Sequence, residues 1–297
     1  MVGLALAGCA GADAGSGATG DAVRVVASTT VLGSVAEQIV DCGGGQVQTL
    51  MPVGADPHDY APSSDDVAKI VTATLVVTNG LGLEEGLSSA LATAEQDGAE
   101  VLEVGPSLDP QPLAGTTDSP DPHVWLDVAR MATAASLIGE ELSTVTGDAG
   151  YRECGTHVAA SLTQTDAEMR TILEAVPEAS RVLVTDHDAF GYFARAYGFT
   201  VAGVVIPGGS TLAQPSSAEL ADLAETVRGS GVSAIFSNTA SPTVLVDALA
   251  KESGQQVSVV PLYVGSIGPE GSDADTYASM MLTDAHRVAD ALVHKEG

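Results

Sequence analysis

The segment 151–179, YRECGTHVAASLTQTDAEMRTILEAVPEA, divides this 297-residue sequence into two similar halves. Val158, Leu162 and Leu173 recur near the spacing of an amphipathic helix, and a proline marks the end of the pattern. The preceding stretch 127–146 is also helical in character, so no strand is expected between 127 and 175. One long helix between two halves predicts two lobes with a cleft between them.

Short β-branched runs alternate with amphipathic stretches on both sides of this helical region. The strand candidates are 23–28, 47–52, 74–79 and 100–104 before it, and 181–186, 201–206, 234–238 and 257–262 after it. Such alternation is typical of βαβ units in parallel sheets that helices cover. The predicted fold class is α/β: two lobes, each with a parallel-type β-sheet flanked by helices, joined by a single long linker helix. The predicted divisions are 1–21 (signal remnant and tether), 22–147 (first lobe), 148–178 (linker helix) and 179–297 (second lobe).

The composition excludes some functions. The chain has 39 acidic and 11 basic residues, a net charge of −28, and 45% hydrophobic residues. It is therefore globular, and it lacks the basic face that a nucleic-acid-binding protein needs, so nucleic acid is not expected as a partner. The acidic surface attracts cations as a long-range field, but it does not define a site.

The N-terminal residues indicate an anchor. The apolar run at the start is too short to span a bilayer, yet Leu6-Ala7-Gly8-Cys9 resembles the bacterial lipobox, in which the cysteine is lipidated. A Gly/Ala/Ser/Asp tract up to about Asp21 follows and reads as a flexible tether. We therefore expect a longer signal upstream, lipidation at Cys9, and a domain held at the outer face of the cell membrane or in the periplasm.

Cys42 and Cys154 remain once Cys9 is assigned to the anchor. Outside the cytosol such a pair is a disulfide candidate, and the alternative is two buried free thiols. The sequence has no CxxC motif, which argues against a thiol redox centre.

Three of the six histidines occupy equivalent places. His58, His123 and His187 each stand in a loop between a predicted strand and the next helix, where ligands of open α/β sheets bind. Asp-Pro precedes both His58 and His123, and proline stiffens such a loop. Neutral imidazole is a good ligand for Zn, Cu, Fe and Ni. The spacing between the histidines is too long for a structural zinc finger, so we expect one metal bound between the lobes.

Metal-bound histidines usually need a second group to hold the other ring nitrogen. The aspartates near these histidines are candidates for that role: Asp56, Asp59, Asp121, Asp127, Asp186 and Asp188. For any one histidine alone, a cap or a surface loop is the alternative. We expect His157, His286 and His294 to be solvated or capping residues.

Four motifs now carry a resemblance. PVGADPHDYAPSSDDVAKI (52–70), DPHVWLDV (121–128), TDHDAFGYFARAYGF (185–199) and DADTYASMMLTDAHRVADAL (273–292) stand in this order. The sequence resembles the zinc- and manganese-binding solute-binding proteins of bacterial ABC uptake systems over nearly its whole length beyond residue 22.

The resemblance implies four metal ligands, His58, His123, His187 and Asp275. In that family a histidine at the third position goes with zinc and a glutamate with manganese, so His187 implies Zn²⁺, with Mn²⁺ as the alternative. It also implies capture of the metal in the cleft outside the cytoplasmic membrane and delivery to an ABC permease. We expect a monomer and no enzyme activity.

Some positions depart from the family's pattern. The segment before His123 is acidic but poor in histidine, Gln214 stands where a glutamate is common, and Ser237-Asn238 stands where an acidic residue is frequent. We keep Asn238 as a candidate that supports the metal ligands without binding the metal itself. The rival functions are a surface adhesin, which some relatives provide, and a zinc hydrolase, for which HExxH and a nucleophile elbow are missing.

Overall fold

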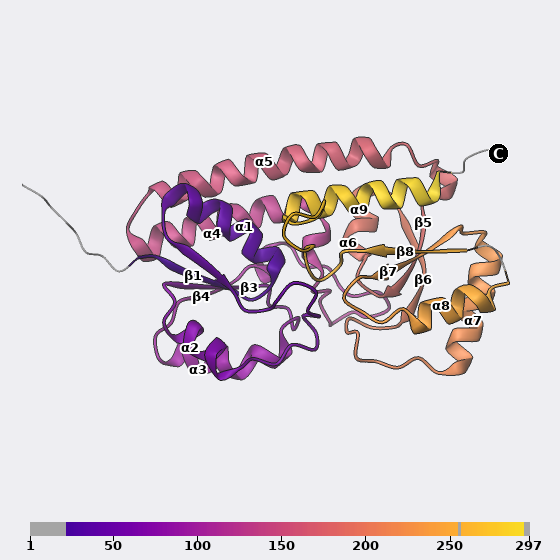
Figure 1. Cartoon of the computed structure of the whole chain (residues 1–297), viewed down its shortest axis with the longest axis horizontal. Helices are drawn as coiled ribbons and strands as arrows, with labels where there is room; N and C mark the ends of the chain where they lie inside the picture. The colour runs from indigo at the N-terminus through magenta and orange to yellow at the C-terminus, as the bar shows by residue number, and fades with distance from the viewer. Residues whose placement is uncertain (1–21, 255–256, 294–297) are drawn as a thin grey trace, which may run out of the picture.

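The computed structural model describes residues 22–254 and 257–293 and shows two four-stranded sheets, one in each lobe (Figure 1). Every strand pairing in both sheets is parallel. The first lobe has the strand order β2-β1-β3-β4 and the second β6-β5-β7-β8. The strands are β1 (Arg24–Ala27), β2 (Gln46–Thr49), β3 (Leu75–Thr78), β4 (Val101–Glu103), β5 (Val182–His187), β6 (Thr200–Ile206), β7 (Ala234–Asn238) and β8 (Ser258–Leu262). The predicted α/β class is confirmed.

Helices cover these sheets, as a parallel sheet requires. The first lobe and the connection contain α1 (Thr30–Gly43), α2 (Ser64–Val71), α3 (Ser88–Gln96), α4 (Val128–Thr146) and α5 (Gly150–Leu173). The second lobe contains α6 (Gly191–Tyr197), α7 (Ser217–Ser230), α8 (Val244–Glu252) and α9 (Tyr277–Leu292). Short 3₁₀ helices lie at Glu85–Leu87, Gly105–Ser107, Val124–Leu126 and Glu178–Ser180. The central strands β3 and β7 are buried along their whole length, which explains their unbroken apolar runs.

Helix α5 runs along both lobes and packs against α1, α4 and α9 (Figure 1). Its approach to α4 is close because glycines face each other: a β-carbon on Gly139 would lie 2.7 Å from Gly155 Cα. The chain also returns to the first lobe after β8. There Trp125 Nε1 donates to the carbonyl of Val264 (2.7 Å) and the amide of Tyr277 donates to Ser34 Oγ (2.9 Å). The lobes therefore touch along this returning segment as well as through α5.

A disulfide joins Cys42, near the end of α1, to Cys154 in α5, with a Cα–Cα distance of 5.8 Å. The disulfide expectation is thus confirmed, and the alternative of two free thiols is wrong. The bond ties a first-lobe helix to the linker helix. Cys9 and its lipobox lie outside the described residues. None of the helices in the described residues combines the length and apolar character that crossing a bilayer requires.

Candidate metal centre

The three loop histidines meet between the lobes. His58 lies in the loop between β2 and α2, His123 directly precedes the 3₁₀ helix at 124–126, and His187 is the last residue of β5. One ring nitrogen from each lies within 4.8 Å of the other two. Nε2 of His58 and Nε2 of His123 are 3.2 Å apart. Across residues 22–254 and 257–293, no other group of three histidine, cysteine or acidic side chains converges in this way.

Aspartates hold two of the three rings. Asp121 Oδ1 accepts from both the backbone amide (3.0 Å) and Nδ1 (2.8 Å) of His123. Asp186 Oδ1 does the same for His187, at 2.9 Å for each contact, and its Oδ2 accepts from the amide of Asn238 at 2.8 Å. A carboxylate on Nδ1 places the ring proton there and leaves the Nε2 lone pair free for a metal.

His58 is held differently. Asp56 Oδ1 accepts from the His58 backbone amide (3.0 Å), while Asp56 Oδ2 accepts from Thr211 Oγ1 of the second lobe (2.5 Å). Within the described part of the chain, no hydrogen bond to Nδ1 of His58 is formed. The ring is placed instead by its contacts with His123 and His187, whose centroids lie 5.3 Å and 5.9 Å away.

Burial keeps the rings of His58 and His123 neutral. It lowers the pKa of His58 to about 3, with repulsion from His123 as the next cause, and it lowers the pKa of the fully buried His123 as well. Burial also raises the pKa of Asp121 to about 7. Since only an unprotonated imidazole nitrogen binds a metal, a site that resists protonation is prepared for a cation.

The other predicted aspartates have different surroundings. Asp59 is exposed. Asp127 caps α4 by accepting from the amide of Ala129, and it pairs with Arg130. Asp188 is buried close to Asp121, which together with burial raises the pKa of Asp188. None of these three carboxylates hydrogen-bonds a ligand histidine.

Asp275 does not belong to the group of ligand atoms that lie within 4.8 Å of one another. It is partly exposed, and its Oδ2 accepts from the backbone amide of Gly271 at 3.1 Å. His157 and His286 are exposed on α5 and α9, and His294 lies outside the described residues.

Two contributors were missed by the sequence analysis. Thr211 reaches Asp56 from the other lobe, and Tyr192 in α6 donates from its hydroxyl to the carbonyl of Asp121 at 2.9 Å. Both are distant in sequence from the loops that they support. The neighbourhood of Thr211 carries no signal for the role, whereas Tyr192 stands in the motif 185–199, which does not show that it reaches Asp121.

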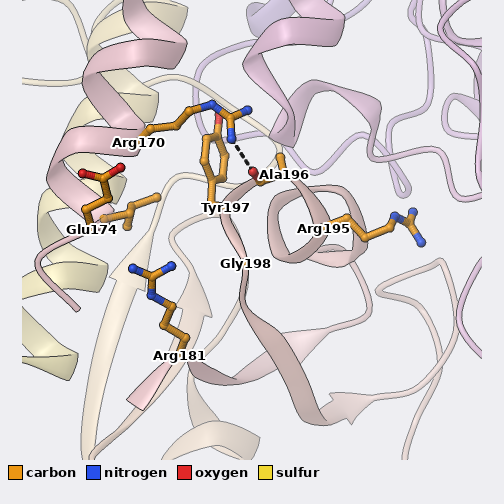
Figure 2. A pocket seen from close by; sticks show the side chains of 8 residues that line it. Arg170, Glu174, Arg181, Arg195, Ala196, Tyr197 and Gly198 are labelled. Carbon is orange, nitrogen blue, oxygen red and sulfur yellow. Dashed lines mark hydrogen bonds between the residues drawn. The ribbon is translucent and has the colours of Figure 1, made fainter. Parts of the chain in front are cut away.

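A separate cavity of about 360 Å³ lies in the second lobe, where the end of α5 meets α6 (Figure 2). Arg170, Arg181 and Arg195 line it, and Arg170 donates to the carbonyl of Ala196. Glu174 also lines it, but the guanidinium groups of Arg170 and Arg181 face the same space (Figure 2) and repel a cation. This cavity is therefore unsuited to metal binding, in contrast to the histidine cluster.

The comparisons with known proteins agree with this geometry. Residues 25–291 match the family model described as zinc-uptake complex component A, periplasmic. The chain belongs to this family. Members are metal-binding solute-binding proteins of transporters, a class distinct from enzymes, so the predicted family is confirmed.

Some relatives of this chain are named for manganese and others for zinc. The chain is 31% identical to the manganese-binding lipoprotein MntA of Bacillus subtilis, covering 97% of this chain and 95% of that protein. It is also 31% identical to the zinc-binding protein TroA of Treponema pallidum, and the alignment covers 89% of this chain and 87% of that protein. The solved periplasmic zinc-binding protein TroA from the same organism superposes with a TM-score of 0.85 at 28% identity, covering 92% of this chain and 100% of that one.

Proposed function

We propose that this protein is an extracytoplasmic zinc receptor that binds Zn²⁺ in the cleft and delivers it to an ABC permease. The observation that carries the proposal is the convergence of His58, His123 and His187 within 4.8 Å. Ligands of a tetrahedral zinc with bonds of about 2.0 Å lie about 3.3 Å apart. The 3.2 Å between Nε2 of His58 and Nε2 of His123 fits that spacing.

The fourth ligand in this proposal is Asp275. Its Oδ2 accepts from the amide of Gly271, which leaves Oδ1 as the oxygen for the metal. With Asp275 bound, four protein ligands would complete the shell of zinc and leave no position for an activated water, which argues against a hydrolase. Asp275→Ala is then expected to weaken zinc retention.

Manganese is the second candidate, because one group of relatives is named for it. Three imidazole nitrogens favour zinc over manganese, which prefers oxygen ligands in an octahedral arrangement. The adhesin alternative is supported only by a shared fold: the laminin-binding adhesin Lmb of Streptococcus agalactiae superposes with a TM-score of 0.79 at 23% identity.

The proposal includes the partners. A monomer anchored through a lipid on Cys9 would carry the cleft to the permease at the membrane surface. The relatives named as lipoproteins support this anchor.

The test is elemental analysis of protein purified without added metal, followed by calorimetric titration of the metal-free protein with Zn²⁺ and Mn²⁺. We expect one equivalent of zinc and tighter binding of zinc than of manganese. Absence of zinc binding would overturn the proposal, and preference for manganese would replace it with the second candidate.

A further inference from the structure

The segment between β6 and α7, residues 207–216, lies where the ligand loops meet, and we name it the cleft loop. It starts beside His187, because Ile206 at the end of β6 is paired in register with His187 at the end of β5. Gly208 has a φ of +92°, a conformation that favours glycine. The cleft loop is therefore attached to the second-lobe ligand.

The cleft loop also contacts both first-lobe ligand loops. Thr211 Oγ1 donates to Asp56 Oδ2 at 2.5 Å, and the other oxygen of Asp56 accepts from the amide of His58. Gly209 packs against the second loop so closely that a β-carbon would lie 3.2 Å from Leu113 Cδ2 and 3.8 Å from Cδ of Pro122. One segment thus connects the surroundings of all three histidines.

A cavity lies beside the hydrogen bond between Thr211 and Asp56. This cavity of about 370 Å³ is lined by Asp56 and Asp59 from the first lobe and by Thr211, Leu212 and Val244 from the second. Leu212 is 56% exposed, so the tip of the cleft loop is not fixed by burial. At this edge of the cleft, the hydrogen bond between Thr211 and Asp56 is the polar contact that joins the cleft loop to the His58 loop.

We propose that the cleft loop is a latch that slows release of the bound metal, with Thr211 as the positioning residue. This inference rests on the proposed zinc-binding function. Asp56 holds the backbone of His58, and Thr211 holds Asp56 from the opposite lobe. His58 has no carboxylate on its Nδ1, so it is the ligand whose position depends most on this contact. Loss of the Thr211 hydroxyl frees Asp56 and lets His58 leave the metal sooner.

Stopped-flow measurement of zinc dissociation into excess chelator tests the latch. Trp125 is the sole tryptophan, and its ring lies 5.3 Å from that of His123, so its fluorescence reports on the site. Thr211→Val keeps the shape of the side chain and removes the donor. We expect it to raise the dissociation rate about tenfold, as loss of one hydrogen bond to a charged group implies, and Thr211→Ser to restore the wild-type rate.

A matched control separates the latch from a general effect of the substitution. Thr226→Val makes the same change at an exposed position of α7, where the hydroxyl donates to the backbone carbonyl of Asp222, and it should release zinc at the wild-type rate. If Thr211→Val also releases zinc at that rate, the latch is overturned.

Hydrogen exchange on metal-free protein tests the latch without zinc. Thr211→Val should speed amide exchange in 207–216 and in the His58 loop, whereas unchanged exchange there would refute the latch. A wild-type chain that binds no zinc would instead refute the proposed function, and the metal-free exchange would still decide whether the hydroxyl orders the two loops.

Discussion

The two Asp-Pro-His loops of the first lobe share a tripeptide and a backbone turn, yet they hold their histidines differently. In each, the aspartate Oδ1 accepts from the histidine amide at 3.0 Å. Asp121 also holds the ring of His123 through Nδ1. Asp56 leaves the ring of His58 alone and uses its second oxygen for Thr211. The same motif thus fixes the backbone in both loops, but it fixes the ring in only one.

Burial explains the difference. The side chains of His123 and Asp121 are buried, with exposed fractions of 0% and 2%. The hydroxyl of Tyr192 also donates to the carbonyl of Asp121. Without water, the buried Asp121 carboxylate must find donors within the loop, and the imidazole supplies one. Asp56 is partly exposed and reaches another lobe. We infer that His123 is a preset ligand and His58 an adjustable one.

Removing either histidine should produce the largest effect on zinc binding. His123→Ala and His58→Ala each delete a ligand, which costs more than the 10- to 100-fold typical of outer-shell changes. We therefore expect the dissociation constant from calorimetry to rise by more than about hundredfold in both variants. His157→Ala, on the exposed face of α5, is the control and should bind like wild type. Unchanged binding after His123→Ala would remove His123 from the site.

Replacing the aspartates should separate the two loops. Asp121→Asn keeps an acceptor for the backbone amide but loses the charge that orients the ring of His123, and we expect about tenfold weaker zinc binding. Asp56→Asn changes no contact to a ring: its Oδ1 can accept from the His58 amide and its Nδ2 can donate to Thr211 Oγ1 in place of the native bonds. We therefore expect a change in the dissociation constant of about threefold or less. Competition with a zinc chelator measures both. Equal losses would show that the two loops hold their ligands alike, against the comparison drawn above.

The features that depend on local sequence pattern could be predicted from the sequence. Alternating apolar runs predicted both parallel sheets, and the place of His58, His123 and His187 after strands predicted their convergence. The motif could not show which aspartate holds a histidine ring, because Asp56 and Asp121 both stand before Pro-His and differ in burial. Contacts between distant segments, such as Thr211 with Asp56, depend on how the lobes pack. Asp275 makes a local contact instead, because its carboxylate accepts from the amide of Gly271.

The smallest effect concerns the network of hydrogen bonds that joins the His58 loop to α2. Asp66, in the capping box of α2, accepts from Tyr60 Oη (2.8 Å), from Ser63 and from Lys69 Nζ (2.8 Å). Burial raises the pKa of Asp66, but the hydrogen bonds from Lys69, Ser63 and Tyr60 outweigh it and hold the pKa well below the usual range. The charged carboxylate therefore stabilises the fold next to His58.

The sign of the pH dependence follows from the lowered pKa. Its stabilising effect is complete above the unfolded pKa of about 3.9 and is lost as the pH falls from there through the lower folded pKa. Asp66→Asn should lower the free energy of unfolding at pH 7 by about 1–2 kcal/mol, and the difference from wild type should shrink below about pH 4. Urea denaturation across that range measures it.

The neighbouring Asp65 provides the control for this prediction. It is exposed in the first turn of the same helix, so Asp65→Asn should change stability by less than about 0.5 kcal/mol. If Asp66→Asn is as stable as Asp65→Asn, the network does not anchor the loop. If it is less stable but binds zinc within about threefold of wild type, the anchor stabilises α2 while His58 is placed by Asp56 and the cleft loop, as an adjustable ligand requires.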